Sequence, residues 1–222
     1  FTGTNGKTSV VWLVSSILNT SGLDVKSLGT LGYYRNLKKI NEVSLTTPEK
    51  EELHQLSYLS SSKKMEFVFE VSSHGISKKR IKNLPINIAA ITNITQDHLD
   101  YHRTFHNYRK TKLKLFLNYL SKQGIAILND NIEKIDLLKQ ILKKRNVKFI
   151  TYGKNKSDVN CISSKNSNKL KIYSKRYNIK FHATKNFELE NLACSVCCCL
   201  AVGLSAKQII TSISKISKPR GR

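Results

Sequence analysis

The first eight residues constrain what this chain can fold into more than any other segment. They read Phe1-Thr2-Gly3-Thr4-Asn5-Gly6-Lys7-Thr8 and lead into an apolar run with helical spacing that stops at Ser21-Gly22. In a phosphate-binding loop, glycines let backbone N–H groups turn toward phosphate oxygens, a lysine supplies positive charge and a hydroxyl completes a Mg²⁺ shell. The general motif has a glycine where Phe1 stands, so a glycine-rich turn that merely caps the helix is the alternative. We predict a phosphate-binding loop.

Strand-like and helix-like patterns alternate along most of the chain. This alternation predicts an α/β fold, a doubly wound and mostly parallel sheet whose ligands lie beyond the carboxyl ends of the strands. A polar loop is expected between Gly32 and Thr46, and a small antiparallel β patch within residues 158–183. The expected strands are residues 25–30, 65–71, 86–94, 124–129 and 147–152, and the expected helices are residues 9–20, 48–59, 105–120, 132–145, 188–202 and 206–216.

The length and the termini bear on domain organisation and location. A chain of 222 residues can bury the core of one large α/β domain, with two smaller domains as the alternative. It begins inside the loop motif, without the strand that normally precedes one, so we expect a fragment cut at its N-terminus. The sequence has no signal peptide and no apolar run of membrane-spanning length, which favours a cytoplasmic location and no membrane partner.

The net charge is +23, from 38 basic and 15 acidic residues. The lysines are dispersed, in pairs such as Lys78-Lys79 and Lys143-Lys144, with no interleaved aromatic residues on which bases would stack. We therefore expect anionic small substrates, and not nucleic acid, as the partners of this charge.

Four of the five cysteines lie within residues 194–199. Their neighbours are apolar and helical in spacing, and cysteine often packs as a small buried hydrophobe. Structural zinc would need two further ligands, and the sequence has no second Cys or His pair at ligand spacing. We expect reduced thiols packed in the core.

Glu70 lies near the end of the β-prone run at residues 65–71, where a buried carboxylate is unfavourable unless it meets a cation. A Mg²⁺ held jointly with Thr8 would supply that cation. The alternative is that Glu70 faces a loop and accepts a hydrogen bond from a backbone N–H. Four histidines follow the expected strand ends, and each taken singly fits an ordinary polar loop residue: His74, His98, His102 and His106.

Several ordered segments together resemble the Mur ligase family, the ATP-dependent enzymes that build the peptide stem of bacterial peptidoglycan. Residues 70–75 (Glu-Val-Ser-Ser-His-Gly) followed by Arg80 look most like its MurE branch, which joins a diamino acid or lysine to UDP-N-acetylmuramoyl-L-alanyl-D-glutamate (UDP-MurNAc-L-Ala-D-Glu). The other segments that carry the resemblance are residues 2–8, 46–49, 93–102 and 108–112.

The resemblance covers residues 1–222 and corresponds to the family's central ATP-binding domain. It implies that the N-terminal UDP-binding domain and the C-terminal domain are absent, so the fragment alone is expected to be inactive. It also implies a cytoplasmic ligase that takes part in cell wall biogenesis and thereby in cell shape and cell division. The ligands of such an enzyme are ATP, Mg²⁺, UDP-MurNAc-dipeptide and an amino acid. In such enzymes the γ-phosphoryl group passes to the substrate carboxylate, and the incoming amine attacks the resulting acyl phosphate. We expect a monomer.

The resemblance implies catalytic roles for Lys7, His98 and Lys112. Lys7 would hold the β- and γ-phosphates, Thr8 and Glu70 the first Mg²⁺, and His98 a second Mg²⁺. Lys112 aligns with a lysine that CO₂ carbamylates, which turns a cation that would repel Mg²⁺ into an anion that attracts it. A slip in alignment would select one of its neighbours, Lys110 or Lys114.

Further ligand contacts follow from the same resemblance. The ATP-binding set is Gly3, Thr4, Asn5, Gly6, Lys7, Thr8, Ser9, Asn191 and Arg222, and the set for the muramoyl-peptide is Thr46, Thr47, Ser72 and Arg80. Lys78 stands where a glutamine is common in relatives. The family's Gly-x-Phe-Asn, which precedes a second Asn, is replaced by residues 185–188 (Lys-Asn-Phe-Glu), although Asn191 can still reach adenine.

Two other functions stay open. One is another ligase of the same superfamily, such as folylpolyglutamate synthetase, which residues 70–75 with Arg80 disfavour. The other is a basic P-loop switch that binds nucleotide and nucleic acid, which would not need a second metal at His98 and Lys112.

Overall fold

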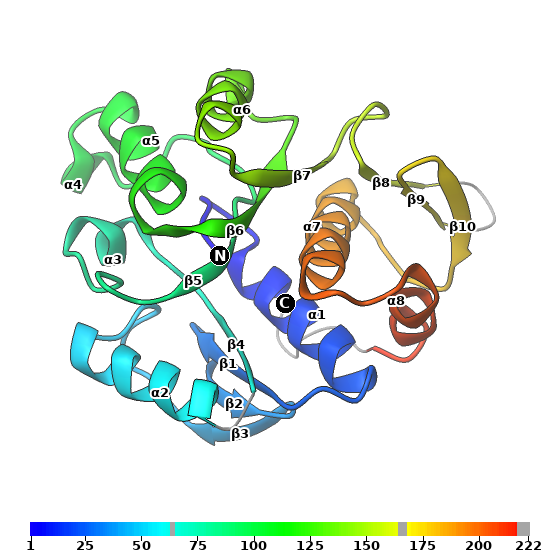
Figure 1. Cartoon of the computed structure of the whole chain (residues 1–222), viewed down its shortest axis with the longest axis horizontal. Helices are drawn as coiled ribbons and strands as arrows, with labels where there is room; N and C mark the ends of the chain where they lie inside the picture. Colours follow the sequence, from blue (N-terminus) through cyan, green and yellow to red (C-terminus); the bar gives the residue numbers. More distant parts are fainter. Residues whose placement is uncertain (63–64, 164–167, 217–222) are drawn as a thin grey trace.

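The computed structural model describes residues 1–62, 65–163 and 168–216, with helices on both sides of two β-sheets (Figure 1). The smaller sheet has the strand order β3-β2-β1-β4, and the larger has the order β10-β9-β8-β7-β6-β5. Within the described ranges, no helix combines the length and the apolar character needed to cross a membrane. The strands are β1 Val25–Gly29, β2 Gly32–Arg35, β3 Lys38–Asn41, β4 Glu66–Phe69, β5 Ile86–Ala90, β6 Leu120–Asn129, β7 Lys148–Tyr152, β8 Val159–Ile162, β9 Asn168–Ile172 and β10 Lys175–Ile179.

Parallel pairs occupy the centre of the fold and antiparallel pairs its edges. Strand β1 runs parallel to β4, and strands β5, β6, β7 and β8 run parallel to one another. Strands β8, β9 and β10 pair antiparallel, which confirms the antiparallel patch expected within residues 158–183. The α/β fold class is therefore confirmed. The helices are α1 Lys7–Thr20, α2 Lys50–Ser62, α3 Ser73–Ser77, α4 Leu99–His102, α5 Phe105–Lys114, the π-helix η1 Leu115–Tyr119, α6 Ile135–Lys144, α7 Asn186–Val202 and α8 Ala206–Ile213.

The prediction of a polar loop between Gly32 and Thr46 was wrong for most of this segment. Strands β2 and β3 form an antiparallel hairpin there, which continues the sheet from β1. The connection is made by Asn36 and Leu37, both with positive φ (49° and 65°). Hairpin turns of this kind are recognised in sequences by Asn-Gly or Asp-Gly pairs, so the Asn-Leu pair gave only a weak signal.

Phe1 and Thr2 lie between the two sheets. The Phe1 amino group donates to Phe69 O at the end of β4 (2.8 Å), and Val71 N donates to Phe1 O (2.7 Å). On the other side, Thr2 N donates to Ala90 O of β5 (2.9 Å). These two residues therefore join the sheets just before the phosphate loop.

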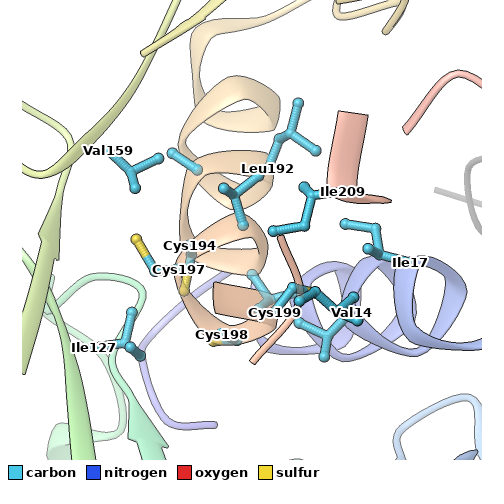
Figure 2. Close-up of a cluster of buried hydrophobic side chains, with 14 of the residues drawn as sticks. Val14, Ile17, Ile127, Val159, Leu192, Cys194, Cys197, Cys198, Cys199 and Ile209 are labelled. Carbon is cyan, nitrogen blue, oxygen red and sulfur yellow. The ribbon is translucent and has the colours of Figure 1, made fainter. Parts of the chain in front are cut away.

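Alternate residues of the strands supply two separate cores, one on each face, as expected for strands covered on both sides. On β6, Ile127 belongs to the core beneath α1, α7 and α8, while its neighbours Ala126 and Leu128 belong to the core beneath α3, η1 and α6. Figure 2 shows the first of these cores, where side chains of α1, α7 and α8 meet those of β6 and β8.

The cysteines of α7 pack in this core, as expected from the sequence. Cys194, Cys197, Cys198 and Cys199 are each no more than 1% exposed and are not in disulfides. Burial raises the pKa of the Cys197 and Cys198 thiols well above the usual value. These thiols therefore act as small apolar side chains between α1 and the sheet.

Candidate functional site

The predicted phosphate loop leads into α1 as expected. Gly6 caps the helix with φ of 84°, a left-handed conformation that favours glycine, and Lys7 is the first helical residue. A Cβ atom on Gly3 would lie 1.8 Å from Thr92 Oγ1, and one on Gly6 would lie 2.4 Å from Asn191 Oδ1. Both glycines are therefore required by close neighbours from distant parts of the chain.

Residues 92–95, which follow β5, hold the loop in shape. Thr4 N donates to Asn93 O (3.0 Å), and the Thr4 hydroxyl lies 3.1 Å from Thr95 O and 3.0 Å from Thr95 N. Asn5 N donates to the Asn93 side chain (2.9 Å). The sequence motif alone did not indicate this second segment as a support for the loop.

One cavity of about 390 Å³ brings together most of the predicted site residues. It joins the phosphate loop to the ends of β1 and β4 and to the segments that precede α2, α3 and α4. The predicted proximity of Lys7, Glu70 and His98 therefore holds in the structure. The lining residues are Thr4, Asn5, Gly6, Lys7, Thr8, Thr30, Leu45, Thr46, Thr47, Glu70, Ser72, His74, Arg80 and His98.

Glu70 follows β4 and is only 1% exposed, although it lines the cavity with Thr8. Its Oε1 accepts a hydrogen bond from Thr30 N (2.8 Å), and its Oε2 lies 3.4 Å from the Thr30 hydroxyl. The alternative in which Glu70 accepts a backbone N–H is therefore also realised. A carboxylate has about four acceptor positions, so these contacts leave capacity for a cation.

The residues predicted for the muramoyl-peptide are partly engaged within the chain. The buried Thr47 hydroxyl lies 3.1 Å from Glu70 O and accepts from Ser72 N (2.9 Å), and Ser72 Oγ accepts from Gly75 N to cap α3. The buried Arg80 guanidinium donates to Thr47 O (2.8 Å) and to the Glu49 carboxylate (2.5 Å). Arg80 and Thr47 thus shape the loop before α2, while the Thr46 side chain stays at the cavity.

Lys112 lies on α5 beneath the phosphate loop and is 1% exposed. Its Nζ donates to Gly3 O (2.7 Å), and Lys7 Nζ donates to the same carbonyl (3.0 Å) and to Thr4 O (3.0 Å). Burial, with a further contribution from the positive charge of Lys7, lowers the pKa of Lys112 from 10.5 to about 7. Lys112 therefore has a large neutral fraction near neutral pH.

Three of the four histidines gather at one side of the cavity. The His74 ring lies 5.2 Å from the His98 ring and 5.9 Å from the His102 ring, between centroids. Burial is the main cause that lowers the pKa of both His74 and His102, so neutral rings are favoured. His106 lies apart on the exposed start of α5.

A second cavity of about 570 Å³ adjoins the first, with which it shares Asn5 and Gly6. Two phenylalanine rings, Phe181 and Phe187, line it together with the side chains of Ser9, Asn93 and Asn191. Apolar rings beside amide groups suit a flat heteroaromatic ring. Sequence reasoning named Ser9 as an ATP contact and Asn191 as an adenine contact, but it missed both phenylalanines. Arg222 lies outside the described residues.

Comparison with known proteins agrees with this geometry. The model of the Mur ligase middle domain matches residues 1–199. The chain belongs to the Mur ligase family. The expected resemblance is therefore confirmed.

Relatives of the chain include diaminopimelate-adding ligases. The UDP-N-acetylmuramoyl-L-alanyl-D-glutamate–2,6-diaminopimelate ligase of Rickettsia rickettsii is 36% identical over 230 residues, which cover 100% of this chain and 48% of the relative. The corresponding ligase 1 of Clostridium acetobutylicum is 34% identical and is covered over 46% of its length. The chain thus spans about half the length of these curated relatives.

Solved structures show the same similarity. A structure of a UDP-N-acetylmuramoyl-L-alanyl-D-glutamate–2,6-diaminopimelate ligase matches with a TM-score of 0.84 and 25% identity, over 99% of this chain and 46% of that one. Escherichia coli FolC in complex with DHPP and ADP matches with a TM-score of 0.68 and 16% identity, over 96% of this chain and 55% of that one. The second similarity concerns the fold alone.

Proposed function

We propose that this chain is the ATP-binding central domain of a ligase that adds the third amino acid to UDP-MurNAc-L-Ala-D-Glu. The observation that carries the proposal is the single cavity that joins the phosphate loop to Glu70, His98 and the Thr46 segment. The printed names of the relatives support the choice of reaction, and 2,6-diaminopimelate is the amino acid in those names. We further propose a monomeric, cytoplasmic protein with no nucleic-acid partner.

The two adjoining cavities fit the two ends of ATP. Gly3 and Gly6 let the loop pack closely against Thr92 and Asn191. Lys7 lies at the N-terminus of α1, where backbone N–H groups and the helix dipole favour phosphate. The larger cavity, with Phe181, Phe187 and Asn191, suits the adenine ring. We assign the phosphates to residues 3–8, the adenine side to Ser9 and Asn191, and a further ATP contact to Arg222.

The donor set also fits Mg²⁺. Among the described residues, no three His, Cys, Asp or Glu side chains are arranged to hold a metal by themselves. Mg²⁺ is commonly bound by one or two carboxylates together with phosphate oxygens and water, so a single carboxylate beside a hydroxyl is sufficient. Thr8 and Glu70 would hold one ion and His98 a second, and bound Mg²⁺ would neutralise charge that develops on the phosphates.

Lys112 fits the role of a carbamylated lysine. An amine must be neutral to attack CO₂, and burial lowers the pKa of Lys112 to about 7. Carbamylation joins the Nζ atom to the CO₂ carbon and releases a proton, which leaves an anion where a cation would repel Mg²⁺. Lys110 and Lys114, the alternatives by alignment, are both exposed, which favours Lys112.

The protein groups would position the reactants and stabilise charge. Lys7 and the loop N–H groups would orient the γ-phosphoryl group toward the substrate carboxylate, which becomes an acyl phosphate before the amine attacks. Thr46 and Ser72 line the same cavity and offer hydroxyl groups to the muramoyl-peptide. Thr47 and Arg80 would act there chiefly by holding the Thr46 segment in place.

Nucleotide binding to the chain tests the proposal. Isothermal titration of wild type with ADP in excess Mg²⁺ should give saturable binding, and Lys7→Ala should weaken it at least about tenfold, because a charge-assisted contact contributes about 1.5–3 kcal/mol. Lys114→Ala, on the exposed side of α5, is the matched control and should bind as wild type does. Equal affinities of wild type and Lys7→Ala would refute the phosphate role.

A further inference from the structure

The end of strand β1 has no side chain where the Glu70 carboxylate lies. Strands β1 and β4 are parallel, with Leu28 opposite Phe69, so Gly29 stands beside Glu70. A Cβ atom on Gly29 would meet Glu70 Oε1 at 2.2 Å and its Cδ and Cγ at 2.6 Å. Gly29 does not have a positive φ, so this position needs glycine for space and not for backbone conformation.

Thr30 holds the same carboxylate from two sides. Its N–H donates to Glu70 Oε1 (2.8 Å), while its hydroxyl lies 3.4 Å from Oε2. Two contacts from one residue fix the carboxylate plane more firmly than either contact alone. Thr30 itself is exposed at the cavity, so a change in its side chain does not disturb a core.

The hydroxyl of Thr30 also contacts the hydroxyl of Thr46, at 3.1 Å. When Thr30 donates to Glu70, Thr46 is the donor to Thr30, so a chain of hydroxyl groups runs from Thr46 to the carboxylate. The hydroxyl of the next residue, Thr47, donates a hydrogen bond to the main-chain oxygen of Glu70 (3.1 Å). The Thr46-Thr47 pair therefore contacts Glu70 at its side chain through Thr30 and at its backbone directly.

We propose that Gly29 and Thr30 are positioning residues for the Glu70 carboxylate, and that Thr46 couples the muramoyl-peptide side of the cavity to it through Thr30. The inference deepens the proposed function, because it assumes that Glu70 binds Mg²⁺. Gly29 provides the space for the carboxylate, and Thr30 sets its orientation. When substrate binding moves Thr46, the Thr30 hydroxyl loses or changes its hydrogen bond with Thr46, and its contact with the Glu70 carboxylate changes in turn. Residues that orient a metal ligand commonly contribute about 10- to 100-fold to metal affinity.

The Mg²⁺ affinity of the chain saturated with ADP is the quantity to measure. The single tryptophan, Trp12, lines a small cavity with Thr8, Gly29 and Glu70, so its fluorescence is a local reporter of a Mg²⁺ titration, with calorimetry as the independent measurement. Gly29→Ala should weaken Mg²⁺ binding about 10- to 100-fold, and Thr30→Val about tenfold because the Thr30 N–H remains. Thr30→Ser keeps the hydroxyl and should restore the wild-type affinity.

The two variants should differ in their effect on stability. An alanine at position 29 would displace the buried Glu70 side chain from its Cγ to its carboxylate, so Gly29→Ala should also lower the thermal unfolding temperature. Thr30→Val changes an exposed side chain, so its thermal unfolding and metal-free ADP affinity should match wild type. Thr46→Val should lower Mg²⁺ affinity less than Thr30→Val does. Thr211→Val, on the exposed face of α8, is the control and should change nothing.

The result also separates this inference from the proposed function. If wild type binds ADP with no dependence on Mg²⁺, and Glu70→Gln behaves as wild type, then the proposed function fails at Glu70. If Glu70→Gln loses Mg²⁺ binding but Gly29→Ala and Thr30→Val both retain it, the positioning role is overturned. A loss in Thr30→Val that Thr30→Ser does not restore would overturn the role of the hydroxyl.

Discussion

At the scale of single residues, the site depends on polar side chains buried against backbone oxygens. Lys112 is the extreme case, because its ammonium group lies under the phosphate loop with Gly3 O as acceptor. Its Nζ lies over the Tyr108 ring, 4.5 Å from the ring centroid. Burial and the positive charge of Lys7 lower the pKa of Lys112 and favour the neutral amine over the cation, and this preference has a measurable effect on stability.

Lys112 should make the stability of the chain depend on pH. Its pKa is about 7 when folded and 10.5 when exposed, so between these values the unfolded chain carries a proton that the folded chain lacks. The free energy of unfolding should therefore rise with pH across this window. In Lys112→Met this contribution is absent, and urea unfolding at the two ends of the window should show a smaller rise than wild type.

The exposed Lys114 on the same helix provides the comparison. Lys114→Met should retain the wild-type dependence on pH, because it removes an exposed side chain and leaves the buried Lys112 in place. The same wild-type slope in Lys112→Met would show that Lys112 is not a buried neutral amine.

The sequence was sufficient to predict most of the residues that meet at the cavity, but not Thr30 or Leu45, and not how the side chains are held. Lys7, Glu70 and His98 were expected together because each follows a strand end or opens a helix on one edge of the sheet. The contact of Arg80 with Glu49 and that of Thr30 with Glu70 depend on the conformations of loops. Such conformations carry no periodic signal, so these partners could not be found from spacing.

At the scale of elements, helix α7 completes the phosphate loop that precedes α1. Asn191 of α7 is 7% exposed, and its Oδ1 is the atom that a Cβ on Gly6 would meet at 2.4 Å. The helices α1 and α7 also pack against each other through the core shown in Figure 2. The position of the loop is thus linked to the packing of two helices from opposite ends of the chain.

The glycines at the two ends of α1, Gly6 and Gly22, allow the cost of a left-handed backbone to be measured apart from the cost of a steric clash. Gly6 and Gly22 have similar positive φ values (84° and 92°), but a Cβ on Gly22 would meet nothing within 4 Å. Gly22→Ala should therefore lower the free energy of unfolding by about 1–2 kcal/mol, the cost of left-handed backbone. Gly6→Ala should cost more, and it should also weaken ADP binding, as measured by urea unfolding and calorimetry.

The double variant Gly6→Ala with Asn191→Ala tests the source of the difference. Removing the Asn191 side chain should recover part of the extra loss in stability, because the clash is with that side chain. If Gly6→Ala and Gly22→Ala lower the free energy of unfolding equally, the proposed clash between residue 6 and Asn191 is contradicted.

Element types were predictable where apolar residues recur with a clear period, and boundaries were less so. The helix expected over residues 105–120 ends at Lys114 and continues as the π-helix η1, after which β6 begins at Leu120. Residues 115–120 are largely apolar and fit either state, and contact with β5 decides where the strand starts. One sheet was expected, whereas the structure has two, which the hydrogen bonds of Phe1 and Thr2 join between β4 and β5.

At the scale of the whole molecule, a net charge of +23 is spread over many exposed lysines. Dispersed charge gives weak, sequence-independent attraction to polyanions that falls steeply with salt. Retention on a heparin or RNA column should therefore vanish at moderate salt concentration. Tight retention that depends on RNA sequence would instead favour the nucleic-acid switch.

The hydrogen bonds between residues 4–5 and 93–95 have a consequence for the order of folding. Partners about 90 positions apart must meet before the phosphate loop can acquire its shape. Contacts this distant in sequence form late, because the long intervening chain must first be closed. During synthesis, residues 4–5 emerge from the ribosome before residues 93–95, so we expect the loop to reach its folded conformation only after β5 and the segment that follows it have docked.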